Sequence, residues 1–144
     1  MPCVILLLQT QHTHLLETAQ TLVYTAASEA DGQGLKAFRD LLVRHDRMER
    51  NVFQRLGAPA TARGLAYEFD RALATQAGYD GIAVAEAARQ IGQTIEDHAN
   101  AQEGELFPDL IDRHDESIRH KLGDYYARIP VDSAGLAMTT PAAA

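Results

Sequence analysis

Cysteine and tryptophan are nearly missing from this chain of 144 residues, which contains one cysteine, Cys3, and no tryptophan. A single cysteine excludes an internal disulfide framework and a metal site built from several thiolates. Aromatic residues are also sparse, at 6% of the chain, whereas 46% of its residues are hydrophobic. With alanine and leucine so frequent, this composition favours packed helices over a β-sandwich.

Positive charge is in deficit as well. The chain has 13 Lys and Arg against 20 Asp and Glu, for a formal net charge of −7, and no basic stripe occurs along it. Nucleic acid is therefore excluded as an expected partner. The apolar run from Val4 to Leu8 has no Lys or Arg before it and is too short for a signal sequence or a membrane span. These features predict a cytoplasmic protein that does not contact a membrane.

Hydrophobic residues recur at helical spacing, and strand-like alternation is not found. The pattern predicts helices over about 4–27, 35–56, 65–77 and 82–107, the last continuing, kinked by Pro108, toward Tyr126. Glycine-rich breaks separate the predicted helices. The expected fold is all-α, an up-down four-helix bundle formed by residues 1–130 as one domain. A small, polar tail, 131–144, is expected to be disordered.

The second predicted helix carries polar residues on an apolar face. His45 and Glu49 are four residues apart and share that face with Phe38, Leu42 and Val52. A histidine and a carboxylate inside an apolar stripe are costly unless something satisfies them. A divalent iron, zinc or manganese ion would do so. The alternative is a buried His–Glu hydrogen bond without a metal.

The first predicted helix adds another inward histidine. His12 lies on the same face as Leu15, Leu16 and Ala19, whereas His14 falls on the opposite side and is expected at the surface. Later in the chain, His114 and His120 follow Pro108 among acidic residues, and are expected to be exposed helix residues.

On the fourth predicted helix, His98 lies at one border of the apolar stripe. At about 100° per residue, Gln102 and Glu103 straddle the centre of that stripe, whereas Glu105 points toward solvent. Three helices thus each offer an inward histidine. Cys3 has no convincing base, and Ser28, Ser117 and Ser133 stand in no nucleophile motif, so no catalytic residue is assigned.

These segments resemble the hemerythrin-like (HHE cation-binding) family. The resemblance covers about residues 5–112 and is carried by "LLQTQHTHLL", "FRDLLVRHDRMERNVFQRLG" and "HANAQEGELFPDL". The last phrase is the most specific, with a histidine, an acid five residues later and then Leu-Phe-Pro. The resemblance implies a four-helix bundle around a non-haem di-iron centre.

By position, the resemblance implies that His12 and His45 hold one iron and that Glu49 bridges the pair. His98 would then belong to the second iron, and Glu103 would be the second bridge. Two differences from the family pattern stand out. In "GLAYEFDRALAT", Phe69 occupies the apparent ligand position of the third helix, and Gln102 replaces the glutamate that many members have four residues after the last histidine.

The implied function is binding of O₂, NO or peroxide for carriage, sensing or detoxification, with weak peroxidase or catalase activity as an option. Because Phe69 removes a nitrogen ligand, we expect partial or asymmetric iron loading. Two alternatives stay open. One is a bundle that has lost its metal and serves as an interaction module, and the other is a mononuclear site formed by His12, His45 and Glu49 with water.

Overall fold

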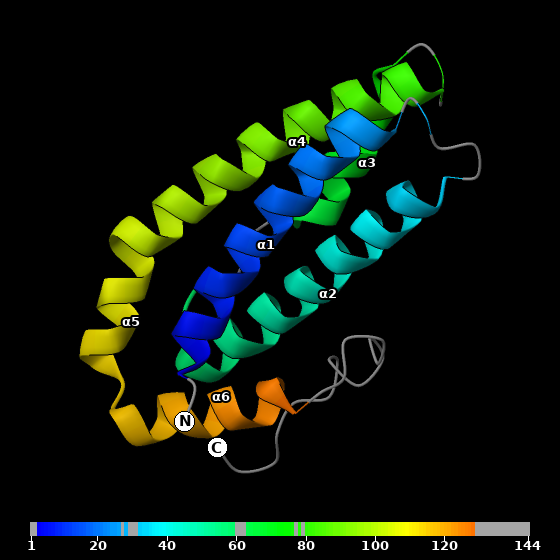
Figure 1. Ribbon diagram of the computed structural model, residues 1–144. Coiled ribbons are helices and arrows are strands. Elements are labelled where there is room, and N and C mark those ends of the chain that lie inside the picture. The colour runs from blue at the N-terminus through cyan, green and yellow to red at the C-terminus, as the bar shows by residue number, and fades with distance from the viewer. Residues whose placement is uncertain are drawn as a thin grey trace.

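The computed structural model describes residues 3–26, 28, 32–59, 63–76, 78 and 80–128. Within these ranges the chain is helical and contains no β-strand, which confirms the all-α prediction (Figure 1). The elements in chain order are α1 (Val4–Thr25), α2 (Gln33–Leu56), α3 (Leu65–Ala74), α4 (Gly81–Ala101), the π-helix η1 (Gln102–Leu106), α5 (Phe107–Arg113) and α6 (Glu116–Ala127). Among the residues described, no helix has the length and apolar character that crossing a membrane requires. The predicted tail, 131–144, lies outside the described residues.

Local signals account for several helix ends. α2 ends at Gly57, whose φ of 66° is a left-handed conformation that glycine adopts without steric cost. α4 begins after Asp80, whose carboxylate accepts a hydrogen bond from the backbone N–H of Ala83. The first three helices and the start of the fourth therefore lie close to their predicted ranges.

The start of α3 is capped by a residue from another helix. Asp46 of α2 accepts hydrogen bonds from the backbone N–H groups of Leu65 and Ala66, at 2.8 and 2.9 Å. These are two of the N–H groups that a helix cannot satisfy internally at its first turn. A carboxylate there also interacts favourably with the positive end of the helix dipole. Asp46 thus joins α3 to the middle of α2.

The prediction that the fourth helix continues toward Tyr126 is wrong. It passes through η1 and α5 and ends at Arg113, and α6 begins separately at Glu116. Pro108 has no N–H, and its ring would clash with the carbonyl four residues earlier in a regular helix. Just before it, the N–H of Phe107 bonds the carbonyl of Gln102, five residues back, as in a π-helix.

The break between α5 and α6 has a local cause at His114 and Asp115. His114 is extended, with φ −123° and ψ 133°, and Asp115 caps α6 by accepting a hydrogen bond from the N–H of Ile118. This break turns α6 across the end of the molecule where α1 begins and α2 ends (Figure 1). α6 packs there against α1.

The helices enclose two apolar clusters. α1 packs against α4 and α2, and α3 packs against α4 and α2. The first apolar cluster contains Leu15, Ala19, Leu22, Ala26, Phe38, Leu42, Leu65, Phe69, Leu73, Val84, Ala87, Ala88, Ile91 and Ile95. The second apolar cluster contains Val4, Ile5, Leu8, Met48, Val52, Phe53, Leu56, Phe107, Leu110, Leu122 and Tyr126. Burial of these side chains is the main favourable contribution to folding.

Candidate metal centre

Four of the side chains predicted to point inward lie together. His12 of α1, His45 and Glu49 of α2 and His98 of α4 each offer one ligand atom, and these atoms all lie within 4.8 Å of one another. We call these four residues the His/Glu cluster. Its residue types and spacing could hold a metal ion.

The His/Glu cluster forms a polar layer between the two apolar clusters. On α1, His12 lies between Leu8, from the second apolar cluster, and Leu15, from the first. His45 and His98 occupy the corresponding boundary on α2 and α4. Apolar side chains on both sides shield this layer, so its polar atoms depend on one another or on a bound ion.

Glu49 is at the centre of the cluster. Its Oε2 lies 2.8 Å from Nε2 of His45 and 3.0 Å from Nε2 of His98, and its side chain is only 5% exposed. Burial alone would raise the pKa of Glu49, but the N–H groups and positive charge that His45 and His98 offer when protonated hold that pKa below its usual range. The carboxylate is therefore ionised at neutral pH, which is the form that binds metals.

One ring nitrogen of His45 lacks a hydrogen-bond partner in this arrangement. Its Nδ1 lies 2.7 Å from the amide oxygen Oε1 of Gln11, while the amide nitrogen of Gln11 donates to the sulfur of Met48. In this amide orientation, Nδ1 of His45 carries the proton and Nε2 presents a lone pair toward Glu49. Nε2 accordingly has no hydrogen-bond partner. A cation bound by both groups would remove the repulsion between the two lone pairs.

His12 is the most deeply buried histidine of the cluster, with 1% of its surface exposed. Neither of its ring nitrogens has a hydrogen-bond partner among the described residues. Burial, followed by the charges of His45 and His98, lowers the pKa of His12 to about 3. The ring therefore stays neutral and keeps a lone pair available to a metal. Unpaired buried nitrogens are rare in proteins, and a bound ion would account for them.

Glu103, predicted as a second bridge, lies at the edge of the cluster rather than within it. Its Oε2 is 3.5 Å from Nδ1 of His12, and its side chain is 36% exposed. The buried position beside Glu49 belongs instead to Gln102, whose Nε2 donates to Oε1 of Glu49 at 2.8 Å. The π-helix places Gln102 there, because the N–H of Phe107 bonds the carbonyl of Gln102 five residues back, and a regular helical period carries no signal of this change.

α3 contributes no member to the His/Glu cluster. Phe69, at its predicted ligand position, is fully buried in the first apolar cluster, with its ring centroid 5.0 Å from that of Phe38. The predictions for His14 and Glu105 are confirmed, because both are exposed.

The prediction of exposed helical positions is wrong for His114. This residue is half-buried in the extended link between α5 and α6, and its Nε2 lies 2.6 Å from the carbonyl oxygen of Leu56. The break before Asp115 turns the ring toward α2. His120 is on α6, with its Nε2 3.3 Å from a carboxylate oxygen of Glu116 and its side chain 25% exposed.

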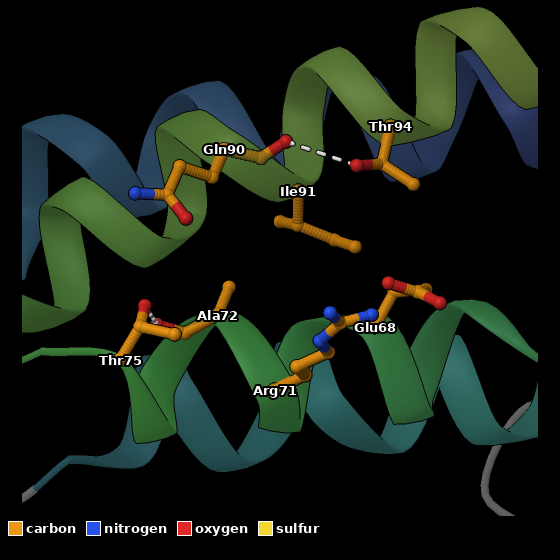
Figure 2. Close-up of a pocket in the computed structure, with 7 residues that line it drawn as sticks. All are labelled: Glu68, Arg71, Ala72, Thr75, Gln90, Ile91 and Thr94. Atoms are coloured by element: carbon orange, nitrogen blue, oxygen red, sulfur yellow. Dashed lines mark hydrogen bonds between the residues drawn. The ribbon is translucent and has the colours of Figure 1, made fainter.

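Two surface hollows differ in their relation to this centre. An open groove of about 530 Å³ is lined by Phe53, Pro59, His98, Ala101, Gln102, Glu105, Leu106 and Asp109. This groove reaches a member of the cluster, His98, and its neighbour Gln102. A smaller hollow of about 160 Å³ separates α3 from α4, where Glu68 and Arg71 face Ile91 and Thr94 (Figure 2). None of its lining residues belongs to the His/Glu cluster.

Comparisons of the chain with protein-family profiles, with curated proteins and with solved structures found no match.

Proposed function

We propose that this chain is a non-haem iron protein that holds its ion with His12, His45, Glu49 and His98. The observation that carries the proposal is the pair of buried, unpartnered nitrogens of His12 within a group whose ligand atoms lie within 4.8 Å of one another. Three imidazoles and a carboxylate suit ferrous iron well. Zinc and manganese share these preferences, so iron is the choice that the resemblance to hemerythrin-like proteins favours.

The surroundings of the ligands support the proposal. A metal-binding histidine usually donates its other ring N–H to an oxygen acceptor, which fixes the tautomer and the ring orientation. Gln11 provides that acceptor for His45. Glu49 is oriented in the same way, because Gln102 donates to its Oε1 and leaves Oε2 facing His45 and His98.

The arrangement of the helices supports the proposed hemerythrin-like, up-down four-helix bundle. α1, α2, α3 and α4 pack in the pairs that such a bundle requires, and the three histidines come from three of these helices. A complete di-iron centre would need further nitrogen ligands from α3. Because Phe69 is packed against Phe38, we propose that one ion is bound per chain.

An iron ion held by His12, His45, Glu49 and His98 would supply the capacity to bind O₂, NO or peroxide, which suits carriage, sensing or detoxification. The residues of this chain shape that chemistry by controlling access. The two apolar clusters exclude water from either side of the cluster, and the groove beside His98 opens it to solvent. The proposed partner is therefore a small molecule that enters along α4 and η1.

The test is the metal content of purified protein, measured by elemental analysis after expression with iron and without chelators. We expect about one iron per chain in the parent. His45→Ala should lose the metal, whereas His14→Ala, an exposed histidine two residues from His12, should keep it. A well-folded parent without metal would overturn the proposal and favour a metal-free interaction module. Equal losses in both variants would show that the His/Glu cluster is not the binding site.

A second candidate, a di-iron centre, is favoured by the position of Glu103. Its carboxylate is 3.5 Å from His12, close enough for a modest movement to bring it onto a second ion. Under this candidate, the parent holds about two irons per chain and Glu103→Gln loses one of them. Under the one-ion proposal, Glu103→Gln leaves the metal content unchanged.

A further inference from the structure

Gln102 is a buried polar residue, and only one of the two polar groups of its side-chain amide makes a hydrogen bond. It is 8% exposed and begins η1. A carboxylate can only accept hydrogen bonds, so the amide group that contacts Oε1 of Glu49 at 2.8 Å must be the N–H. The amide oxygen of Gln102 is therefore on the other branch, and it has no hydrogen-bond partner in the part of the chain that the structure describes.

An unpartnered amide oxygen at this depth is unfavourable, and most buried polar atoms in proteins are hydrogen-bonded. A methionine would fill the same space without this cost. The backbone around Gln102 is also unusual, because a π-helix is rare and is often found at functional sites. Its longer turn brings Gln102 against Glu49 and leaves Glu103 partly exposed.

Gln102 also lines the groove that reaches His98. The volume of this groove, about 530 Å³, is more than a diatomic gas needs. Its walls combine the apolar Phe53 and Leu106 with the acids Glu105 and Asp109. The two acids disfavour anions and accept an uncharged ligand with both polar and apolar parts.

We propose, as an extension of the proposed function, that Gln102 is a ligand-positioning residue that selects hydroperoxides. Its N–H holds Glu49 in place, and its amide oxygen accepts a hydrogen bond from the O–H of hydrogen peroxide or a small alkyl hydroperoxide bound beside His98. O₂ and NO carry no hydrogen and gain nothing from this acceptor. The site thus binds hydroperoxides in preference to diatomic gases.

The test compares ligands that do and do not carry a hydrogen. Apparent dissociation constants for hydrogen peroxide and azide are measured by rapid-mixing absorbance on the iron(III)-loaded protein, with the metal content of each sample determined first. The variant is Gln102→Met, which keeps the length of the side chain and removes both hydrogen-bonding groups. The matched control is Gln93→Met, the same exchange at an exposed position of α4 outside the groove.

We expect Gln102→Met to keep its iron and to weaken peroxide binding about five- to tenfold, the effect of losing one hydrogen bond. Its azide affinity should change less than about twofold, since azide offers no donor, and Gln93→Met should change neither constant. Equal weakening of both ligands, or no weakening of peroxide, would overturn the proposal.

Loss of iron would also be decisive. If both Gln102→Met and Gln102→Glu, which retains an acceptor, lose their iron, Gln102 holds the metal site together and does not select ligands. A parent that binds no iron would instead end the proposed function itself. The two failures are therefore distinguishable from the metal content of the parent.

Discussion

Phe38 and His45 lie on one face of α2, seven residues apart, yet the layers of core around them are built in opposite ways. Phe38 meets Phe69 edge to face, with the ring planes at 84°, and both side chains are fully buried in the first apolar cluster. His45, only 2% exposed, meets Glu49 and the other two histidines. The aromatic layer contains no polar side-chain atom that needs a partner, whereas the polar layer leaves buried nitrogens without hydrogen-bond partners.

The distance between the aromatic layer at Phe38 and the polar layer at His45 explains why α3 packs on the first and not on the second. Seven residues of α-helix rise about 10 Å, so a side chain packed on Phe38 is roughly two turns away from His45. α3 therefore contributes its Phe69 to the apolar layer and its first turn to the cap provided by Asp46. α3 thus supports the His/Glu cluster structurally, while α1, α2 and α4 supply its members.

The largest expected effect comes from breaking the polar layer at its centre. Glu49→Gln keeps the shape of the side chain but removes the only carboxylate of the His/Glu cluster. We expect metal affinity to fall more than about 100-fold, beyond what loss of a supporting hydrogen bond causes. Competition with a chromophoric chelator measures this. Glu17→Gln, at an exposed position on α1, should keep the affinity of the parent, and an unchanged Glu49→Gln would place the metal elsewhere.

The next effect tests the aromatic layer. Phe69→His puts a polar ring where a phenylalanine is fully buried, and we expect the free energy of unfolding to fall by about 3 kcal/mol. Urea denaturation followed by circular dichroism measures this change. The metal content should not rise, because position 69 faces Phe38. A gain of metal would show that α3 approaches the His/Glu cluster. Tyr67→His, at a position 52% exposed on the same helix, is the matched control.

A smaller effect is expected where α3 is joined to α2. Asp46→Ala removes the acceptor for the N–H groups of Leu65 and Ala66, and should lower the free energy of unfolding by about 1–2 kcal/mol. The metal content should be unaffected. Asp40→Ala, at an exposed position on α2, should change stability by less than about 0.5 kcal/mol. Similar losses in both variants would contradict the capping role.

The smallest effect is expected at the surface between the same two helices. Arg39 donates through Nε and Nη2 to the two carboxylate oxygens of Asp70, at 2.9 and 2.8 Å, but the side chains are 47% and 44% exposed. A double-mutant cycle with Arg39→Ala and Asp70→Ala should give a coupling free energy of about 0.5 kcal/mol that shrinks in high salt. A coupling that is larger and insensitive to salt would mean that this pair contributes substantially to holding α3 in place.

Several features followed from the sequence by itself, because they depend on neighbours within one or two turns. The helical period placed His12, His45 and Glu49 on inward faces and His14 outside, and each is buried or exposed as predicted. The helix ends at Gly57 and Asp80 have local chemical causes as well. The sequence did not show which of Gln102 and Glu103 is buried, because at a regular 100° per residue both lie beside the centre of the apolar stripe.

Tertiary structure alone decided how these faces meet. The π-helix before Pro108 alters the turn, so Gln102 is buried against Glu49 while Glu103 stays partly exposed. The Asp46 cap and the packing of Phe69 against Phe38 fix the position of α3 on α2, and α3 adds no member to the His/Glu cluster. His98 joins His12 and His45 only because α4 packs against α1 at that level. Such distances depend on contacts between residues far apart in the chain, which helical periodicity does not encode.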